Sequence, residues 1–519
     1  MKVVTSEQMR ELERKAAEVG LPSHVLMENA GLAVAEGLLK LKKGVMGLPV
    51  VVLVGPGNNG DDGLVAARYL RQWGMEVCLY LCSPRSDDDR NLSAACECGI
   101  PITRAADDAD CAFLRNTLDS TEVVVDSLLG TGRLRPIDGV YKEVLNAVRQ
   151  AKDARPEMAI LAVDLPSGMD ADSGAADPSC LHADLTMTLG YPKSGLFSVS
   201  GKERVGQLIV ADIGIPPSLA ADLQTELLTP AWVLSCLPSR PLDANKGTFG
   251  RVMVAAGSVN YIGAAYLACA AAARVGAGLV TLATASGIQP VLASRLTETT
   301  YVPLPEAEYG VIGADAAKVA SEHLKGYQAL LMGPGLGGHQ QTAEFVRALA
   351  ASSRGRIAQV LDADALNILA GIAEWWHIPA PGAVITPHPG EMARLLGITV
   401  PEVQADRLGV AQRAAVLWGH VVVLKGAHTV IVAPDGRARL STAANPGLAS
   451  AGTGDVLAGA IAGLAAQGLP PFNAACCGVY LHAMAGELVA GEIGDTGMVA
   501  GDLLTALPVA IKRLKTGDD

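Results

Sequence analysis

The sequence has few aromatic residues and no cysteines in a metal-binding spacing. Phenylalanine, tryptophan and tyrosine make up 4% of 519 residues, whereas half of the residues are hydrophobic. Much of the excess is alanine and glycine, which fits closely packed α/β layers. The ten cysteines are scattered, and none forms a Cys-x-x-Cys pair. A reduced chain that uses cysteine as a small hydrophobic residue explains this pattern. We therefore expect a cytoplasmic protein.

Long basic runs are also missing, and the net charge is −12. This argues against nucleic acid or an anionic membrane as the main partner. The first 14 residues are charged throughout, so we expect no signal peptide. Residues 264–285 are apolar except Arg274 and long enough to span a membrane. Because Gly276-Ala277-Gly278 divides them into an alanine-rich helix and a strand, we expect no membrane span.

A third absence concerns nucleotide binding. The second half of the chain contains no Gly-x-x-x-x-Gly-Lys-Ser/Thr loop, and the nearest candidate, Gly201-Lys202-Glu203, has the wrong spacing and lacks the hydroxyl. A bound nucleotide would therefore need a different cradle.

The length indicates two or more domains, since single cores stop growing near ~250–300 residues. Apolar strand candidates alternate with helices in two runs, which is typical of open, doubly wound α/β sheets. The first run ends near Pro216-Pro217, residues 219–240 are predicted to be a connector, and the second run begins at Lys246. We predict a Rossmann-like doubly wound domain over residues 1–218 and a second α/β domain over residues 228–515. The predicted strands are 50–54, 77–81, 123–126, 160–164, 185–189, 207–210, 251–255, 279–283, 329–332, 357–361, 383–386, 421–424, 429–432 and 438–441. The predicted helices include 6–19, 23–41, 64–73 and 456–466.

A glycine-rich motif follows the first strand. Gly55-x-Gly57-x-x-Gly60 has the spacing of a dinucleotide fingerprint. However, no acidic residue closes the second strand, and Asp61 and Asp62 place negative charge where a pyrophosphate would lie. The motif therefore argues against a redox enzyme of the Rossmann type.

Polar residues end several other strands, where open parallel sheets place their ligands. Oxygen atoms of Asn59, Asp126 and Ser167 can hold a hard cation. Asp164 and Lys193 can act as an acid–base pair if Lys193 is partly desolvated. Simpler interpretations stay open, with Asp126 and Asp164 as helix caps and Lys193 as a solvated surface charge.

Three motifs of this half resemble those of the YjeF N-terminal family: Gly57-Asn58-Asn59-Gly60-Asp61-Asp62-Gly63, Val125-Asp126-Ser127-Leu128-Leu129-Gly130-Thr131-Gly132 and Val163-Asp164-Leu165-Pro166-Ser167-Gly168-Met169-Asp170. The family consists of NAD(P)H-hydrate epimerases, which interconvert the C6 epimers of hydrated NADH and NADPH. Asp61 stands where most relatives have glycine. The resemblance covers most of residues 1–215 and implies a potassium site at Asn59, Asp126 and Ser167. It implies that the hydrated nucleotide is bound by Asn58, Asn59, Gly60, Asp61, Asp62, Gly130, Thr131, Gly132, Arg133, Leu134, Arg135, Pro136 and Asp164.

Near the end of the chain, Gly452-Thr453-Gly454-Asp455 precedes a helix-forming stretch without proline, residues 456–466. A tight turn at a helix N-terminus makes an anion site. Asp455, in the first turn, is suited to take a proton from a hydroxyl beside the phosphate. The pattern therefore favours phosphoryl transfer to an alcohol. A glycine-rich turn capped by an aspartate with no catalytic role is the simpler alternative.

Four further polar or glycine-rich loops follow strands in this half, so that five loops are expected at one edge of one sheet. Taken singly, His388 fits a structural histidine and Lys425 a solvated cation. The four loops are Gly333-Pro334-Gly335-Leu336-Gly337, Asp362-Ala363-Asp364-Ala365-Leu366-Asn367, Thr386-Pro387-His388-Pro389-Gly390-Glu391 and Lys425-Gly426-Ala427-His428-Thr429.

This set, with Lys246-Gly247-Thr248-Phe249-Gly250, resembles the YjeF C-terminal, ribokinase-like family over roughly residues 228–510. The family consists of ADP- or ATP-dependent NAD(P)H-hydrate dehydratases. The resemblance implies that Mg²⁺ with ADP or ATP is bound through Lys425, Gly426, Ala427, His428, Thr429 and Gly454. It implies hydrate contacts from Ala264, Ala265, Gly335, Gly337, His388 and Asp455.

The two resemblances together imply a bifunctional enzyme that repairs hydrated nicotinamide cofactors. Asp455 would deprotonate the C6 hydroxyl as it attacks the terminal phosphate, and phosphate would then leave. Asp164 and Lys193 are the catalytic candidates for epimerisation. ADP is the expected nucleotide, with ATP left open, and we expect a homo-oligomer. The alternatives are a kinase that phosphorylates a small vitamin-precursor alcohol and a non-catalytic nucleotide sensor.

Overall fold

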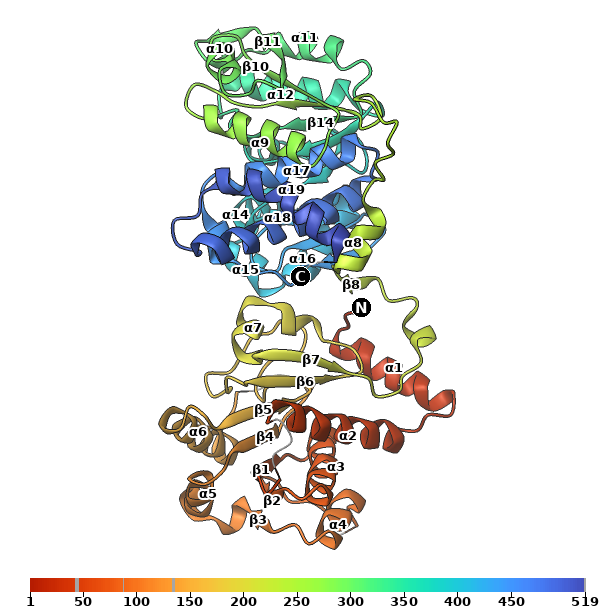
Figure 1. Ribbon diagram of the computed structural model, residues 1–519, viewed down its shortest axis with the longest axis vertical. Helices are drawn as coiled ribbons and strands as arrows, with labels where there is room; N and C mark the ends of the chain where they lie inside the picture. The colour runs from red at the N-terminus through yellow and green to blue at the C-terminus, as the bar shows by residue number, and fades with distance from the viewer. Residues whose placement is uncertain (43–45, 87, 133–135, 518–519) are drawn as a thin grey trace. The chain divides into compact units, whose positions relative to one another are not determined.

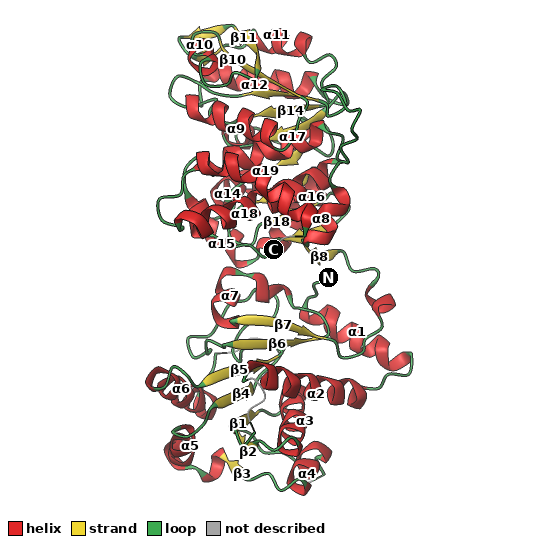
Figure 2. Ribbon diagram, viewed as in Figure 1, coloured by secondary structure: helices red, strands yellow, loops and turns green. Residues whose placement is uncertain are grey.

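The computed structural model describes residues 1–42, 46–86, 88–132 and 136–517. The chain divides into two compact units, Met1–Thr225 and Glu226–Asp519 (Figure 1). Each unit is built on a largely parallel sheet with helices on both faces (Figure 2). The α/β class predicted from the alternation of strands and helices is confirmed.

The first unit contains a seven-stranded sheet with the order β3-β2-β1-β4-β5-β6-β7, in which all neighbours pair in parallel. The strand order reverses between β1 and β4, and ligands bind outside the carboxyl ends of the strands at such a point. The strands are β1 (Pro49–Val54), β2 (Glu76–Leu81), β3 (Ile102–Arg104), β4 (Val123–Ser127), β5 (Ala159–Val163), β6 (Leu185–Leu189) and β7 (Gln207–Ala211).

Strand β1 shows why an unbroken apolar run is needed here. Val50, Val52 and Val54 belong to one hydrophobic core, whereas Val51 and Leu53 belong to the core on the opposite face. A strand that is buried on both faces has no position for a solvated side chain. The first core is shared with α1 (Ser6–Glu18), α2 (Ser23–Leu41), α3 (Asn58–Gln72) and α4 (Arg90–Glu97), and the second with α5 (Ala112–Leu118) and α6 (Gly139–Ala154) (Figure 1). A further helix, α7 (Val199–Val205), precedes β7.

Helix α1 is fixed to the sheet by the residues just before it. A capping box starts this helix, because the Thr5 side chain accepts from the backbone N–H of Gln8 and the Gln8 side chain accepts from the backbone N–H of Thr5. Val4 N–H donates to the carbonyl of Pro192 (3.0 Å), and Ser194 N–H donates to the carbonyl of Val4 (3.0 Å). The chain therefore holds α1 beside the segment that carries Lys193.

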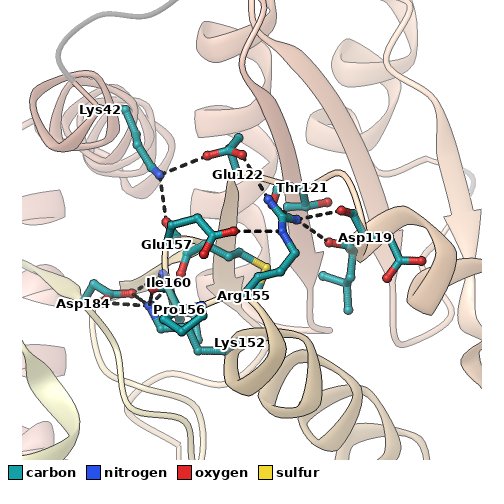
Figure 3. A network of polar contacts seen from close by, with 12 residues as sticks. Lys42, Asp119, Thr121, Glu122, Lys152, Arg155, Pro156, Glu157, Ile160 and Asp184 are labelled. Carbon is teal, nitrogen blue, oxygen red and sulfur yellow. Dashed lines mark hydrogen bonds and ion pairs between the residues drawn. The ribbon is translucent and has the colours of Figure 1, made fainter.

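The amino ends of β4 and β5 carry a network of ion pairs and hydrogen bonds (Figure 3). Arg155 donates to the carbonyls of Asp119 (2.9 Å) and Thr121 (2.8 Å) and to the carboxylate of Glu122 (3.0 Å). Lys42 joins the network through Glu122 (3.4 Å). At the amino ends of these strands, the charged groups are paired with one another. The pocket of this unit lies at the opposite, carboxyl ends of the strands.

The second unit contains a ten-stranded sheet with the order β11-β10-β9-β14-β15-β16-β17-β18-β19-β8. The pairs from β11 to β17 are parallel, and β18 and β19 are antiparallel. Its strands are β8 (Thr225–Leu227), β9 (Arg251–Ala255), β10 (Leu279–Ala285), β11 (Thr300–Leu304), β14 (Ala329–Met332), β15 (Ala358–Leu361), β16 (Val384–Ile385), β17 (Val421–Leu424), β18 (Val430–Val432) and β19 (Ala438–Leu440), with β12 (Glu306–Glu308) and β13 (Val311–Ile312) in a separate pair.

Helix α17 (Thr453–Ala466) lies at the centre of the second unit. It contacts α9 (Ile262–Arg274), α18 (Pro471–Ile493) and strands β9, β14 and β15. Its residues from Val456 to Ala466 are all buried, as expected for a helix that is apolar on every side. A Cβ atom on Gly459 would collide with the carbonyl of Ala268, so only glycine allows this approach of α17 to α9.

The remaining helices complete the layers on this sheet. Among the described residues, α18 alone is long and apolar enough to cross a membrane, and 61% of its most apolar window is buried in the unit. The predicted division of residues 264–285 is confirmed by α9 and β10. The other helices are α8 (Pro230–Cys236), α10 (Gln289–Ala293), α11 (Ala316–His323), α12 (Gln340–Ser352), α13 (Asp364–Ala370), α14 (Pro389–Leu396), α15 (Val400–Ala405), α16 (Arg407–Trp418) and α19 (Ala500–Thr516).

Two predictions about the elements are wrong. Helix α3 begins at Asn58 rather than Leu64, so the polar glycine motif forms the first turns of the helix. Intrinsic propensity disfavours helix at these asparagines and glycines, but packing against β4 overrides it, since a Cβ atom on Gly63 would collide with Ser127. The stretch 219–240 is not a plain connector, because it contains β8 and α8.

Candidate active sites

The first unit has a pocket of about 380 Å³ at the carboxyl ends of β1, β4, β5 and β6. Glycines allow the loops after β1 and β4 to approach each other, since a Cβ atom on Gly55 would collide with the carbonyl of Leu128. The pocket therefore lies at the reversal of strand order. Its lining consists of Met9, Arg10, Glu13, Ser23, Leu26, Met27, Ala30, Pro56, Gly57, Asn58, Asn59, Asp62, Leu128, Leu129, Gly130, Thr131, Gly132, Asp164, Leu189, Lys193 and Ile213.

Asp164 and Lys193 form a buried ion pair in this pocket. Asp164 Oδ1 accepts from Lys193 Nζ, from Leu189 N–H (3.0 Å) and from Thr188 Oγ1 (3.2 Å). Asp164 follows β5 with φ of 64°, which turns its side chain out of the strand direction. Lys193 is 1% exposed and also donates to the Leu189 carbonyl (3.0 Å). Lys193 is therefore not a solvated surface charge.

Asn59, Asp126 and Ser167 meet around the backbone of Leu129. Asn59 Nδ2 donates to the Leu129 carbonyl (3.0 Å), and Leu129 N–H donates to Ser167 Oγ (2.9 Å). Ser167 donates through Oγ to Asp126 Oδ1 (2.6 Å) and through its N–H to Oδ2 (2.9 Å). Burial raises the pKa of Asp126. Asn59 Oδ1 is buried and has no hydrogen-bond partner within the described ranges. An orphaned oxygen beside a carboxylate and a hydroxyl fits a hard cation such as potassium.

The structure separates the other predicted residues of this unit into two groups. Asn58, Asp62, Gly130, Thr131 and Gly132 line the pocket, whereas Gly60, Asp61 and Pro136 are not among its lining residues. Arg133, Leu134 and Arg135 lie outside the described residues.

Asp61 has a partner of its own away from the pocket lining. Its carboxylate pairs with Arg85 (2.6 Å), which also pairs with Asp89 (2.6 Å) and donates to the Gly55 carbonyl (2.7 Å). Arg85 therefore compensates the negative charge of Asp61. Asp62 is different, because burial raises its pKa well above the usual value, assisted by Asp164, Asp61 and Glu13.

Helices α1 and α2 also line the pocket, although no sequence motif pointed to them. Seven lining residues come from these helices, including Glu13, and none belongs to a glycine motif. The available signal was helical spacing, since Glu13 lies one turn after the buried Met9. An acidic residue at that position of an amphipathic helix is unusual and marks a polar cavity.

In the second unit, Lys425 lies between two carboxylates and the start of α17. Its Nζ donates to Asp362 Oδ1 (2.6 Å) and lies 3.8 Å from Glu391 Oε2. A Cβ atom on Gly454 would lie 3.5 Å from Lys425 Nζ. Burial alone would lower the pKa of Lys425, but Asp362, Glu391 and Asp455 outweigh it and raise the pKa. The site therefore has a permanent positive charge beside a helix N-terminus.

Asp455 lies in the first turn of α17, as predicted. Burial raises its pKa to about 7, with further contributions from Asp362, Asp364 and Glu391 that Lys425 only partly offsets. A carboxyl group with a pKa near neutrality is suited to general base catalysis.

The turn before Asp455 is held by groups that are distant in sequence. Gly452 has φ of 91°, in the left-handed region that favours glycine. The Thr453 hydroxyl donates to the carbonyls of Leu448 (2.8 Å) and Ser450 (2.9 Å). His482 of α18 is buried, which lowers its pKa to about 4, so the neutral ring donates from Nε2 to the Thr453 carbonyl (2.9 Å). No local motif pointed to His482.

The predicted substrate contacts from β14 and α9 come together. Gly335 has φ of 62°, and a Cβ atom there would lie 2.8 Å from the Cβ of Ala264. Gly337 N–H donates to Asp364 Oδ2 (2.8 Å). Ala265 is fully buried, whereas Ala264 is partly exposed. The loop after β14 and the start of α9 thus form one wall, on which Ala264 is the more accessible residue.

His388 caps helix α14. Its Nδ1 accepts from Gly390 N–H (3.0 Å), and Glu391 Oε2 accepts from His388 N–H (2.8 Å). Burial lowers the pKa of His388, and burial raises that of Glu391 to about 7. His388 therefore has a structural role as a helix cap, and its contact with the hydrate stays a prediction. Its partner Glu391 lies 3.8 Å from Lys425.

The loop after β17 leaves part of its backbone accessible to a ligand. Gly426 (φ 131°) and Ala427 are exposed, whereas His428 (φ 55°) is buried. The Thr429 hydroxyl donates to the Gly426 carbonyl (2.8 Å). Arg407, which sequence reasoning missed, donates to the Lys425 carbonyl (3.1 Å) from behind the loop. Exposed glycine and alanine in a fixed loop allow close approach of a ligand.

Both halves of the chain match known protein families. A model of YjeF-related protein N-termini matches residues 23–195, and a model of NAD(P)H-hydrate dehydratases matches residues 252–509. The bifunctional NAD(P)H-hydrate repair enzyme of Moorella thermoacetica is 41% identical over 523 residues, covering 99% of this chain and 97% of the relative. The chain belongs to the family of bifunctional NAD(P)H-hydrate repair enzymes.

Other members of the repair family match over the same extent. Those of Thermofilum pendens and Escherichia coli are 37% and 34% identical, covering 99% and 97% of this chain and 97% and 92% of the relatives. The solved ADP/ATP-dependent NAD(P)H-hydrate dehydratase of Bacillus subtilis, co-crystallised with ATP and Mg²⁺, is 33% identical. The match covers 56% of this chain and 98% of that protein, with a TM-score of 0.49. Membership of the repair family does not favour the vitamin-precursor kinase.

Proposed function

We propose that the chain repairs hydrated nicotinamide cofactors. Residues 1–218 interconvert the C6 epimers of hydrated NADH and NADPH, and residues 228–515 dehydrate the S epimer at the expense of ADP or ATP. The observation that carries this proposal is Asp455, an acid with a pKa of about 7 in the first turn of α17, beside Lys425. A lysine, a base and a helix N-terminus are what phosphoryl transfer to an alcohol requires.

Dehydration needs a better leaving group than hydroxide at C6. Asp455 takes the proton of the C6 hydroxyl while that oxygen attacks the terminal phosphate. The backbone N–H groups in the first turn of α17 stabilise the charge on the phosphate. As the new O–P bond forms, the bond between the terminal phosphorus and the rest of the nucleotide breaks, so that AMP leaves from ADP or ADP leaves from ATP. The C6–O bond then breaks with its electron pair going to oxygen, inorganic phosphate leaves, and the lone pair of the ring nitrogen forms a C=N bond to C6. Loss of a ring proton restores NADH or NADPH.

Magnesium fits this site as a companion of the nucleotide. No group of three or more His, Cys, Asp or Glu side chains among the described residues makes a dedicated metal cage. Mg²⁺ that is carried by phosphates keeps several waters and needs only one or two carboxylates. Asp362 would hold it, and the ion would supply positive charge that neutralises the phosphates.

Epimerisation takes place in the pocket of the first unit. The Asp164–Lys193 pair supports acid–base chemistry there, because both groups line the pocket and are bonded to each other. Asn59, Asp126 and Ser167 would hold potassium, which supplies positive charge beside the anionic nucleotide.

The test is to incubate the full chain with a mixture of hydrate epimers and either ADP or ATP. Recovery of reduced-nicotinamide absorbance from both epimers, with release of inorganic phosphate, is the expected outcome. Recovery from only one epimer would contradict the epimerase assignment. A stable phosphorylated product without recovery of absorbance would favour a kinase instead.

A further inference from the structure

Glu13 reaches the epimerase pocket from an element that supplies no other acidic residue to it. It lines the pocket with Asp62, Asp164 and Lys193, but it belongs to α1 rather than to a loop at the sheet edge. The position of α1 is set by two hydrogen bonds: Val4 N–H donates to the Pro192 carbonyl, and Ser194 N–H donates to the Val4 carbonyl. Glu13 and Lys193 are therefore held together by a short, fixed stretch of backbone.

The charges around Glu13 distinguish it from Asp164 and Asp61. Asp62 also has a raised pKa, but it is buried, whereas Glu13 is partly exposed in the pocket. Asp164 is paired with Lys193, and Asp61 is paired with Arg85. The Glu13 carboxylate has no hydrogen bond or ion pair to any part of the chain that the structure describes. Burial raises the pKa of Glu13, and Asp164 adds to this effect, whereas Lys193 and Arg10 oppose it. Among these groups, Glu13 is thus poised to hold a proton next to an ionised pair.

Inversion at C6 requires one proton to be given and one to be taken. The hydroxyl oxygen accepts a proton, and the C6–O bond breaks with its electron pair going to oxygen, so that water leaves. The lone pair of the ring nitrogen forms a C=N bond to C6. Water then adds to the other face of C6, the C=N electrons return to nitrogen, and the added oxygen loses a proton. No oxidant or reductant takes part.

We propose that Glu13 is the proton donor of this epimerisation and that Asp164, held by Lys193, is the proton acceptor. This inference rests on the proposed function of the first unit. It assigns the two roles to groups from different elements, α1 and the loop after β5. Proton donors and acceptors in enzymes need such different environments to hold opposite protonation states at one pH.

The experiment uses the full chain, whose dehydratase unit serves as an internal control. With excess ADP and a mixture of epimers, absorbance recovers in a first phase from the S epimer and a second phase limited by epimerisation. Glu13→Gln is expected to slow the second phase about 10²-fold or more, with an unchanged first phase. Glu13→Asp should recover part of the rate, and Glu7→Gln, an exposed position on the same helix, should change neither phase.

The pH profile separates proton donation from a structural role. The second phase of the unmodified chain should decline at high pH, where the donor is deprotonated, and Glu13→Gln should lose this decline. A Glu13→Gln variant whose hydrate KM rises while kcat is unchanged would overturn the proposal, as would loss of the decline in Asp62→Asn instead. If the unmodified chain shows no second phase faster than spontaneous epimerisation, the proposed epimerase function fails, and this inference fails with it.

Discussion

Each unit places one lysine against one aspartate at the carboxyl ends of its strands, but only in the first unit is this aspartate the catalytic candidate. In the first unit, Lys193 binds the catalytic candidate Asp164 itself. In the second unit, Lys425 binds Asp362, and the catalytic candidate Asp455 remains among other acids. The pKa of Asp455 therefore rises to about 7. The same two residue types make a fixed ion pair in one site and a titrating base in the other.

The strongest way to break this comparison is Asp455→Asn. We expect nucleotide-dependent dehydration to fall about 10²–10⁴-fold, or about 3–5 kcal/mol of barrier, because the base is lost. Epimerisation should be unchanged, since Asp164 and Lys193 belong to the other unit. Phosphate release and epimer interconversion are measured on the same preparation, with the exposed Asp435→Asn as control. Equal loss of both activities would refute the division of labour.

The reciprocal variant is Asp164→Asn. Epimerisation should fall about 10²-fold, because the amide neither accepts the proton nor balances Lys193. Dehydration of purified S epimer should remain at its original rate. Unchanged epimerisation would remove Asp164 from the catalytic role.

A smaller difference concerns monovalent cations. Ser167→Ala removes a hydroxyl that also bonds to Asp126 (2.6 Å). We expect the potassium concentration for half-maximal epimerisation to rise about tenfold or more, with no effect on dehydration. Titration with potassium chloride at constant ionic strength measures this shift. Equal cation dependence of both activities would argue against a potassium site in the first unit.

The pH dependence of dehydration should follow Asp455. A base with a pKa of about 7 is about one-tenth deprotonated one unit below that value, so the rate at pH 6 should be about a tenth of the plateau. The rate should rise with pH through 7 and then level off. A dehydration rate that is flat across this range would show that Asp455 is not the titrating base.

The smallest effect is on stability. The pKa of Asp455 is raised from 3.8 to about 7 on folding, so its carboxylate destabilises the folded state as pH rises above about 4, and fully above about 7. Asp455→Asn removes this penalty. We expect its Tm to exceed that of the unmodified chain by about 2 °C or more at pH 8, and by less at pH 5. Calorimetry at the two pH values tests the sign.

Much of the architecture was predictable from the sequence. Apolar runs such as Val50 to Val54 are typical of buried strands, and their alternation with helices predicted the α/β class. Glycine and polar residues after strands located both sheet edges. The start of α3 was not predictable, because asparagine and glycine disfavour a helix in isolation. Packing of Gly63 against β4 stabilises the helix there in the folded unit.

The parts of the sites that came from distant segments were not predictable. His482 lies 29 residues from Thr453, and Glu13 lies far from every glycine motif. The sequence does not show that Asp61 and Asp62 have different environments. In the structure, Asp61 pairs with Arg85, whereas Asp62 is buried and its pKa is raised. The site assignments, the domain boundaries, the homo-oligomer and the cytoplasmic location stay predictions.

The close packing of α17 has a consequence for how a nucleotide is received. Gly459 packs against Ala268 without space for a Cβ atom, so α17 cannot move closer to α9. A nucleotide therefore meets the N-terminus of α17 in the position that the structure shows, beside the exposed Gly426 and Ala427. Because this part of the site is assembled before the nucleotide binds, little of the binding free energy is lost in ordering it.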